Sequence, residues 1–413
     1  MSHEARRPLE GKVVLDLTTA MAGPMATLFL AGLGARVIKI ENPSRGGDSS
    51  RGNSPYVTAE GLSPSRSGDA DMSVSMMLRG RNKESVTLDL KSEAGRAVFL
   101  DLARQADLVV ENYAAGTTQR LGVDYDSVKD LNPRLVYVSI SGFGQQGGSG
   151  KAMDTIVQAL SGLMMTAGED GDEPVRFGLP IGDLAAPLFA VIGALAAVIE
   201  AERSGRGQHV DVSMLGALTS LVACEPFDAF ETIGMPLRTG SFVPRLAPFG
   251  VFRSADGWFA LCGPTDEFAR GVFAAIGRPD LAEDPRFARR DARVGNADEL
   301  HALIGAWAAS LPTAEIVERF DAEGVPAAPV RSTAEAVRDP LVLSREEVVR
   351  LRHPVHGEVA ELYGSGLPIR MSASPTSLDR PAPRLGEHTE SVLSEFLGLD
   401  GERLEELRRV GAL

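Results

Sequence analysis

Residues 13–41 read VVLDLTTAMAGPMATLFLAGLGARVIKIE, and this stretch decides the fold class. Its first six residues, Val13–Thr18, are rich in aliphatic side chains and predict a short strand. Apolar residues at helical spacing follow over Pro24–Leu33, and Gly34 supplies a stop before the strand-like Val37–Glu41. A strand, a helix and a second strand in this order predict one βαβ unit of a parallel sheet.

The same alternation continues beyond this unit. Strand-like runs occupy Ser85–Leu90, Leu108–Tyr113 and Leu135–Ile140, and a helical pattern covers Ser92–Gln105. A long Ala-rich helix is expected from Leu184 to about Ala201, followed by the strand-like HVDVSM. We therefore expect an α/β protein with a Rossmann-like parallel sheet covered by helices.

The length of 413 residues predicts two domains, since a domain usually holds ~100–200 residues. Residues 1–220 are assigned to the large domain. Residues 225–330 mix β-like runs such as WFALC with helical stretches such as Asp298–Leu311, which predicts a smaller α/β domain. Residues 331–413 are expected to return to the large domain and to end in an amphipathic helix, Thr389–Leu397.

Two further segments carry expectations of their own. The stretch from Pro43 to Met76 is rich in Gly, Ser, Pro and Asp, and irregular chain of that length indicates a functional loop. The longest uncharged stretch, Leu184 to Ile199, falls short of the ~18 residues that a membrane span needs. We expect it to be a buried helix.

Composition excludes several classes of protein. The 42 basic and 56 acidic residues give a net charge of −14, which repels nucleic acid and anionic membrane surfaces. Cys224 and Cys262 form no CxxC motif and no disulfide framework. The beginning of the sequence is polar, without the apolar core of a secretory signal. These features predict a cytoplasmic protein that binds neither nucleic acid nor membrane.

Several familiar chemical motifs fail on their spacing. GQQGGSGK, residues 144–151, has one residue too many for a phosphate loop, and Ala152 stands where Ser or Thr belongs. No G-x-G-x-x-G follows the first strand, so the sheet implies no nicotinamide cofactor. The pair His353 and His356 has a proline between its members and indicates a solvated loop rather than a metal site. No nucleophile elbow is present.

Taken in order, the local motifs resemble the type III CoA transferases, also called the CaiB/BaiF family, over nearly the whole chain. The stretches that carry the resemblance are LEGKVVLDLTTAMAGPMAT, LGARVIKIENP, GRNKESVTLDLK, VVENYAAGTTQRLGVDYDSV, NPRLVYVSISGFG, MDTIVQALSGLM, GLPIGDLAAPLFAVIGALAAV, SGRGQHVDVSML, DPRFARRDARVGNADEL, EGVPAAPV and APRLGEHTESVL.

The resemblance implies an acyl-CoA transferase with Asp183 as its nucleophile. In the family a G-x-P-x-x-D stretch ends in an aspartate at the start of the long helix, and Gly178–Asp183 matches that stretch. The implied chemistry passes coenzyme A between carboxylic acids through an aspartyl anhydride and an aspartyl-CoA thioester, with no metal or redox cofactor. A plain helix-capping role for Asp183 fits the same local pattern. In either role, the helix dipole would favour its ionised form.

The resemblance also implies binding positions for coenzyme A, and an interlocked homodimer whose site can use both subunits. Asp154 matches an acidic position near the nucleophile, where a buried hydrogen-bonding role is an equal alternative. The main-chain N–H groups near Ala22 and Gly23, or those of the glycines in residues 142–150, are candidate donors to an oxyanion. For the lysine and arginine positions the alternative is ordinary surface charge, and for Tyr113 it is core packing. The positions expected to bind coenzyme A are Ala22, Leu88, Lys91, Asn112, Tyr113, Arg120 and Lys151.

Departures from the family pattern narrow the activity. Met153 stands where the family's racemases carry a histidine, which counts against racemisation. The stretch SFVPRLAPFGVF lacks the glycine run of the oxalate-using and formate-using members, so a formyl-CoA:oxalate activity is not expected. Met21 and Asn42 replace a frequent glutamine and a frequent arginine. The replacements at Met21 and Asn42 keep a non-catalytic CoA-binding protein open as an alternative. An acyl-CoA racemase or isomerase is the other alternative, although Met153 counts against it.

Overall fold

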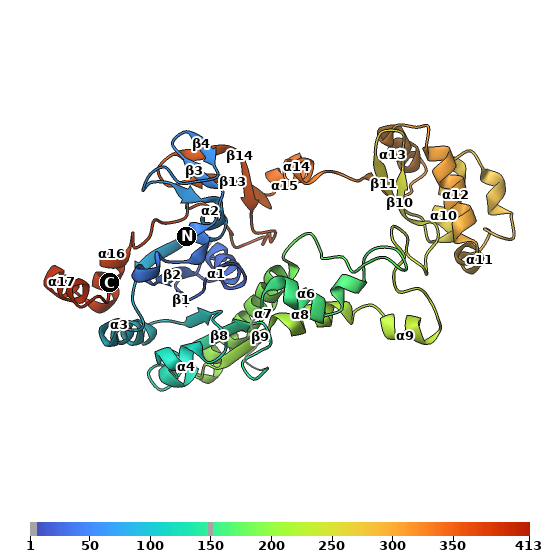
Figure 1. The fold of residues 1–413 in the computed structure, drawn as a ribbon. Coiled ribbons are helices and arrows are strands. Elements are labelled where there is room, and N and C mark those ends of the chain that lie inside the picture. The colour runs from blue at the N-terminus through green and yellow to red at the C-terminus, as the bar shows by residue number, and fades with distance from the viewer. Residues whose placement is uncertain (1–5, 148–151) are drawn as a thin grey trace. The chain divides into compact units, whose positions relative to one another are not determined.

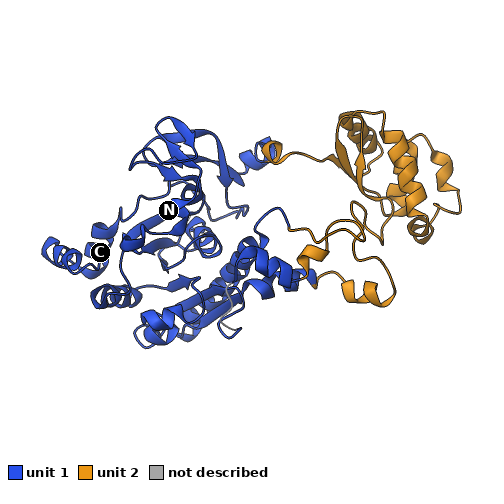
Figure 2. Ribbon diagram, viewed as in Figure 1, with its two compact units in different colours: residues 1–161, 177–222, 337–413 blue, residues 162–176, 223–336 orange. Residues whose placement is uncertain are grey.

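The structure, a computed structural model, describes residues 6–147 and 152–413. By their internal contacts the residues form two compact units, which Figure 2 shows in blue and orange. Unit 1 comprises the residues up to 161 together with 177–222 and 337–413. Unit 2 comprises 162–176 and 223–336, a range that includes a segment the sequence placed with the large domain.

A six-stranded parallel sheet forms the centre of unit 1 (Figure 1), which confirms the predicted fold class. The strand order is β6-β2-β1-β7-β8-β9, and every neighbouring pair is parallel. The strands are β1 (Val13–Asp16), β2 (Arg36–Glu41), β6 (Lys83–Thr87), β7 (Leu108–Glu111), β8 (Val136–Ser141) and β9 (His209–Ser213).

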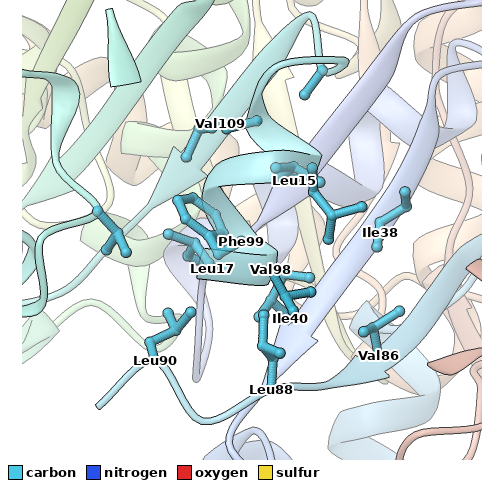
Figure 3. Close-up of a cluster of buried hydrophobic side chains, with 14 of the residues drawn as sticks. Leu15, Leu17, Ile38, Ile40, Val86, Leu88, Leu90, Val98, Phe99 and Val109 are labelled. Carbon is cyan, nitrogen blue, oxygen red and sulfur yellow. The ribbon is translucent and has the colours of Figure 1, made fainter. Parts of the chain in front are cut away.

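The central strands are nearly continuous runs of buried residues because helices cover the sheet. Ser92 begins one of these helices by accepting a hydrogen bond from Gly95 N at 2.9 Å. Phe99 of that helix belongs to the same buried hydrophobic core as Leu15, Ile38 and Val109 (Figure 3). The helices of this part of the chain are α1 (Ala22–Gly32), α3 (Glu93–Ala103), α7 (Ile181–Ser204), α8 (Met214–Val222), α16 (Thr389–Leu397) and α17 (Gly401–Arg409).

The direction of strand addition reverses beside β1. The chain adds β2 and β6 on one side of β1, and then returns to add β7, β8 and β9 on the other side. In open parallel sheets this reversal leaves a crevice at the carboxyl ends of the strands, where ligands bind. The loops that follow β1 and β7 therefore border the expected ligand crevice.

The segment from Pro43 to Met76 is not the irregular loop that its composition indicated. It contains a three-stranded antiparallel sheet in the order β4-β3-β5, and Val57 and Met72 of this sheet pack on Leu351. Its strands are two or three residues long, too short to show alternation in the sequence. Its elements are η1 (Pro43–Arg45), η2 (Ser49–Gly52), β3 (Tyr56–Thr58), β4 (Gly61–Ser63), β5 (Met72–Ser73) and α2 (Val74–Arg79).

A hairpin of β13 (Val348–His353) and β14 (Gly357–Ser365) belongs to the same unit. The prediction of a solvated loop around His353 was wrong, because this residue is the last of β13 and is only 2% exposed. Its Nδ1 accepts hydrogen bonds from Val355 N and His356 N, both at 3.1 Å, and so fixes the turn. The role of His353 is structural.

Unit 2 has its own core, built around the antiparallel sheet β10-β11-β12. Phe259, Phe273 and Phe320 are fully buried between this sheet and the helices. The helix predicted at Asp298–Leu311 is observed as Ala297–Ala308. The elements are α9 (Phe227–Thr232), β10 (Phe249–Arg253), β11 (Trp258–Cys262), α10 (Asp266–Ala275), η4 (Pro279–Ala282), α11 (Arg290–Gly295), α12 (Ala297–Ala308), α13 (Thr313–Ala322), β12 (Ala327–Pro329) and α14 (Thr333–Ala336).

The long helix α7 has 24 residues and extends well beyond the uncharged stretch seen in the sequence. Among the described residues it is the single unbroken helix long and apolar enough to cross a membrane, and 44% of its most apolar window is buried. The bent pair α12 and α13 passes the same test only if it is taken as one span. A core helix of a soluble protein also passes this test. The short helices not yet named are α4 (Thr117–Leu121), α5 (Tyr125–Val128), α6 (Asp154–Leu160), η3 (Leu163–Met165) and α15 (Pro340–Ser344).

Candidate active site

A cavity of about 210 Å³ opens at the carboxyl ends of the strands beside the reversal point. Thr18 follows β1, Asn42 follows β2, Leu88 follows β6 and Tyr113 follows β7, and all four line the cavity. The crevice expected from the strand order is therefore a real hollow, with a buried leucine and a tyrosine ring in its wall. Apolar and aromatic walls suit a flat ring such as adenine.

Three of the predicted binding residues line this cavity directly, namely Leu88, Lys91 and Tyr113. Leu88 is fully buried in its wall, Lys91 is exposed at its rim, and burial raises the pKa of the Tyr113 hydroxyl to about 12. Tyr113 therefore stays neutral at physiological pH. Lys91 offers the positive charge that a phosphate at the rim would need.

The other predicted positions lie around the cavity without lining it. Asn112 fixes the lining residue Thr19 with a pair of hydrogen bonds, accepting from Thr19 N at 2.8 Å and donating to Thr19 O at 2.9 Å. Arg120 donates to Thr117 Oγ1 at 2.9 Å, and Thr117 is another lining residue. Ala22 is buried at the start of α1 and does not line the cavity. Lys151 lies outside the described residues.

A buried group of charges that the sequence did not reveal supports the cavity. Lys39 Nζ lies 2.7 Å from Asp48 Oδ2 and donates to Thr18 O at 2.7 Å. Lys83 Nζ lies 3.0 Å from Asp16 Oδ2. Asp16, Lys39, Lys83 and Asp48 are each at most 5% exposed. Two positive and two negative charges balance within the group, which is the condition under which buried charges are tolerated.

The two lysines of this group have different pKa values. Burial lowers the pKa of Lys83 to about 8, despite the nearby charge of Asp16. Burial also disfavours the charged form of Lys39, but the carboxylates of Asp16 and Asp48 outweigh it and raise the pKa of Lys39. The group thus ties the turn after β1 to β2, to the first residue of β6 and to the cavity-lining Asp48, so that ionic contacts support the cavity wall.

The carboxylate of Asp183 lies in the first turn of α7, as the third helical residue. It is half-buried and makes no hydrogen bond or ion pair with any described residue. Pro180 occupies the N-cap position and provides no side-chain cap. Asp183 is therefore not a helix cap, and its oxygens are left available.

Asp154 performs the capping that Asp183 does not. Its Oδ1 accepts a hydrogen bond from Gly182 N at 2.8 Å, within the first turn of α7. Its Oδ2 accepts one from the Gln158 amide at 2.7 Å. Gln158 in turn holds the segment before α7, because it donates to Leu179 O at 3.2 Å and accepts from Phe177 N at 2.9 Å. Asp154 and Gln158 thus fix the backbone that presents Asp183.

The environment raises the pKa of Asp183 to about 6. Burial is the main cause, and the nearby charge of Asp154 adds to it, while Arg79 acts in the opposite direction. The helix dipole was expected to favour the ionised form, and the pKa is raised in spite of it by desolvation and a like charge. A carboxylate with this pKa is still roughly 90% ionised at pH 7, but is more basic than an ordinary aspartate.

Arg79 is an unexpected component of the site. It is the last residue of α2, only 8% exposed, and its guanidinium group makes no hydrogen bond or ion pair with the described residues. Its Nε is completely buried without a partner. Burial lowers the pKa of Arg79, while the charges of Asp48 and Asp183 support its positive form. Arg79 is therefore influenced both by Asp183 and by Asp48, which lines the cavity.

Arg79, Gln158 and Lys83 were not predicted from the sequence as parts of a site. Arg79 ends a short helix inside the segment that was taken for a loop, so no periodicity marked it. Lys83 begins a strand, where an exposed lysine is the usual interpretation.

Two of the departures from the family pattern lie near the site. Met153 is 75% exposed, and Asn42 donates to Asp89 Oδ1 at 3.1 Å across the cavity.

Comparison with known proteins places this arrangement in context. Residues 9–389 match the family described as CoA-transferase family III. The chain is 36% identical to the formyl-CoA:oxalate CoA-transferase of Streptomyces coelicolor, with 98% of this chain and 99% of the relative covered. It is 34% identical to the succinate–glutarate CoA-transferase of Agrobacterium fabrum, with 94% and 96% covered.

A solved structure agrees with these sequence relatives. A CaiB/BaiF family protein from Brucella suis superposes with a TM-score of 0.80 at 30% identity, covering 95% of this chain and all of that one. Within the described parts of the chain, no group of three or more His, Cys, Asp or Glu side chains is placed to hold a metal ion. The charged groups that act on Asp183 are the carboxylate of Asp154 and the guanidinium of Arg79.

Proposed function

The chain belongs to CoA-transferase family III and is a CoA-transferase, and from this premise we propose that it moves coenzyme A between carboxylic acids through covalent intermediates on Asp183. The observation that carries the proposal is the Asp183 carboxylate itself. It is half-buried, has no partner among the described residues, and has a pKa raised to about 6. An unpaired carboxylate that burial has made more basic is suited to nucleophilic attack.

The reaction conserves one activated acyl bond at every step. An oxygen of Asp183 attacks the thioester carbonyl of the donor, which forms a mixed anhydride and releases the CoA thiolate. The thiolate attacks the aspartyl carbonyl, which frees the donor acid and leaves an aspartyl-CoA thioester. The acceptor carboxylate attacks this thioester, which forms a second mixed anhydride and releases the CoA thiolate. The thiolate then attacks the acceptor's acyl carbon, which forms the new acyl-CoA and restores the Asp183 carboxylate.

Asp154 is proposed to position the nucleophile and to tune it. By accepting from Gly182 N it fixes the first turn of α7, and its charge raises the pKa of Asp183. The nearby negative charge also opposes the retention of a thiolate at Asp183, which favours its transfer onward. Tetrahedral intermediates need hydrogen-bond donors, and the main-chain N–H groups around Ala22 remain our candidates for them.

The cavity beside the strand reversal is proposed to hold the nucleotide part of coenzyme A. Leu88 and Tyr113 would contact the adenine ring, and Lys91 and Arg120 would attract the phosphates. Arg79 is near enough to both Asp183 and the cavity-lining Asp48 for their charges to support its positive form, although it forms an ion pair with neither. This order suits a ligand with a nucleotide at one end and a reactive thioester at the other.

We propose dicarboxylic acids as the acid substrates, with Arg79 binding the carboxylate that does not react. The relatives named above transfer CoA to or from oxalate, succinate and glutarate, which are all dicarboxylic. A buried guanidinium without a partner carries an uncompensated desolvation cost, which a second substrate carboxylate would offset. The formyl-CoA:oxalate pair is the one we do not expect, because the glycine run is missing.

The function is tested by measuring CoA transfer from a panel of acyl-CoAs to a panel of acids, with Asp183→Asn and Asp183→Ala beside the wild type. Ping-pong kinetics in the wild type, and loss of transfer with retained CoA binding in both variants, are the expected results. Exchange of α-deuterium without an acceptor acid would instead indicate the racemase. CoA binding without turnover on any acid would indicate a non-catalytic protein. Retained transfer in either variant would refute the mechanism.

The role of Arg79 is tested separately with Arg79→Met and the charge-conserving Arg79→Lys. The methionine variant is expected to raise KM for a dicarboxylic acceptor at least ~10-fold, the value of one charged hydrogen bond, and to leave a monocarboxylic acceptor unaffected. The lysine variant is expected to recover part of this loss. Equal effects on both kinds of acid would mean that Arg79 has no part in substrate recognition.

We also propose that the chain forms a homodimer through an apolar surface on α6 and α7. Exposed apolar side chains on these helices include Ile156, Leu160, Leu188 and Ile192, and Ile192 is 64% exposed. Light scattering is expected to give about twice the chain mass of 43.8 kDa, and Ile192→Glu to give monomer. Leu341→Glu, at a leucine 66% exposed on α15, is the matched control. Binding to lipid vesicles without dimerisation would refute this proposal.

The interlocked form of the dimer and a cytoplasmic location remain predictions. The sequence contains only two cysteines, which suits a reducing compartment.

A further inference from the structure

A second cavity, of about 480 Å³, lies in unit 1 away from the strand reversal. It is bounded by β13, by the segment 366–381 and by the side chain of Arg81. None of the residues assigned above to CoA binding or catalysis lines it. Its lining carries more positive than negative charge, because only two lining residues, Glu346 and Asp379, are acidic. The lining arginines are Arg81, Arg345, Arg350, Arg352, Arg370 and Arg380.

Arg81 is a fixed part of this cavity rather than a mobile surface residue. It is only 3% exposed, and its Nη2 donates to Ser365 O at 2.6 Å and to Leu78 O at 3.2 Å. Its Nη1 is completely buried and has no hydrogen-bond partner. Burial lowers the pKa of Arg81 to about 10, so the group remains charged at neutral pH without a counterion. A buried charge in this state stabilises an anion that approaches it.

Three further arginines present unpaired guanidinium groups to the same space. Arg350 and Arg352 lie two residues apart on β13 and are exposed, while Leu351 between them is fully buried on the other side. Arg370 is exposed on the facing segment. None of the three guanidinium groups makes an ion pair or hydrogen bond with the described residues. In contrast, Arg345 is already paired with Glu347 at 2.5 Å.

The wall opposite β13 is held in place by Asn82. The Asn82 amide donates to Ser377 O at 2.8 Å, and its Oδ1 accepts from Arg380 N at 2.8 Å. The Arg380 guanidinium returns a hydrogen bond to Asn82 O at 3.0 Å. The acidic lining residue Asp379 is engaged by Arg7 at 3.3 Å. The cavity is thus preformed, and one of its two acidic groups is already neutralised by a partner.

We propose that this cavity is a binding site for a small molecule that carries several phosphate groups. Unpaired guanidiniums on two facing walls, together with the buried Arg81, require an anion with more than one charge. Planar guanidinium groups bind phosphate oxygens in pairs, and the volume lies within the ~300–1,000 Å³ of typical ligand sites. The site is local, because the chain as a whole carries a net charge of −14.

The test is calorimetric titration of tripolyphosphate and ATP into the full chain saturated with coenzyme A. The triple variant Arg350→Ala, Arg352→Ala, Arg370→Ala is compared with a control triple, Arg270→Ala, Arg289→Ala, Arg290→Ala. All six arginines are exposed, and the controls lie in unit 2. One equivalent is expected to bind to the wild type and to the control triple. The affinity of the cavity triple is expected to fall at least ~30-fold, with CoA binding unchanged.

Every other outcome overturns the proposal in a defined way. An equal loss in both triples would show general charge attraction, and no binding to the wild type would show that the cavity has no such ligand. Displacement of coenzyme A by tripolyphosphate would assign the binding to the CoA cavity instead. Binding of citrate as tight as that of tripolyphosphate would show that carboxylates, not phosphates, are the ligand class.

Discussion

Replacing Asp183 with asparagine is expected to abolish transfer and, at the same time, to stabilise the protein at neutral pH. A folded-state pKa of about 6, against an ordinary value of 3.8, means that ionised Asp183 is less favourable in the folded than in the unfolded chain. The protonated form contributes stability below about pH 4, and this contribution is lost as the pH rises through 6. Asparagine resembles the protonated form and avoids this loss.

The size of the effect follows from the shift. About two pH units correspond to ~3 kcal/mol, and because the group is partly exposed, solvent screening reduces the expected gain to ~1–2 kcal/mol at pH 7.5. The loss of a negative charge near the N-terminus of α7 offsets ~0.3–1 kcal/mol of this gain. We therefore expect a net gain near ~1 kcal/mol at pH 7.5, and less at pH 4.5.

The assay is urea unfolding of the wild type and Asp183→Asn at both pH values. Asp228→Asn is the control, since Asp228 lies in the first turn of α9 and is exposed. The control is expected to be neutral or slightly destabilising at pH 7.5. If Asp183→Asn destabilises the protein at pH 7.5 as much as a lost helix cap does, ~1 kcal/mol, the account of a strained, unpaired carboxylate is wrong.

Three further predictions concern Asp183, the buried group of charges and the rim of the CoA cavity. Arg79→Met is expected to move the acidic limb of the pH profile of kcat/KM to higher pH, because Arg79 lowers the pKa of Asp183; an unmoved limb in steady-state kinetics would contradict this. Lys83→Met leaves Asp16 without its 3.0 Å partner and is expected to cost ~3–5 kcal/mol in urea unfolding, whereas a loss below ~1 kcal/mol would mean that Lys39 alone is sufficient. Lys91→Ala is expected to weaken CoA binding ~3–10-fold at low salt, and the difference from the wild type is expected to disappear in 0.5 M salt. Lys129→Ala is the control and is expected to have no effect, because Lys129 is exposed and paired with Asp126 at 2.5 Å. Calorimetry that finds equal CoA affinity in the two variants would remove Lys91 from the site.

The sheet could be predicted from the sequence because its strands are buried on both faces. Runs such as those at β1, β2 and β7 are continuous and apolar, and helices with clear spacing separate them. The observed bounds differ from the predicted ones by a few residues, as at β6, which begins at Lys83 rather than Ser85. Such differences arise because strand ends depend on tertiary pairing that local sequence does not record.

The small antiparallel sheet between residues 43 and 76 could not be predicted in the same way. Its strands have two or three residues, and they are stabilised by packing on Leu351, a residue nearly 300 positions away. His353 was misjudged for a related reason, since its burial depends on the hairpin it ends. Local composition describes these segments correctly as polar, but it does not show which side chains become buried.

For the site, the sequence supplied positions but not their environments. Asp183 and Asp154 were named by resemblance, and the structure adds that Asp154 caps α7 while Asp183 has no partner among the described residues. The charges of Lys39 and Lys83 in buried strands were visible as residues, but their pairing with Asp48 and Asp16 requires the fold. Arg79 was not predicted at all, because a buried, unpaired arginine has no signature in sequence.

The most direct measurement is the mass of the peptide that contains Asp183 after the wild-type protein is incubated with an acyl-CoA donor and quenched with hydroxylamine. The account predicts conversion of Asp183 to its hydroxamate, in amounts that approach one per chain and fall when acceptor acid is added. A peptide of unchanged mass under conditions where transfer is under way, or a label on a different residue, would contradict it.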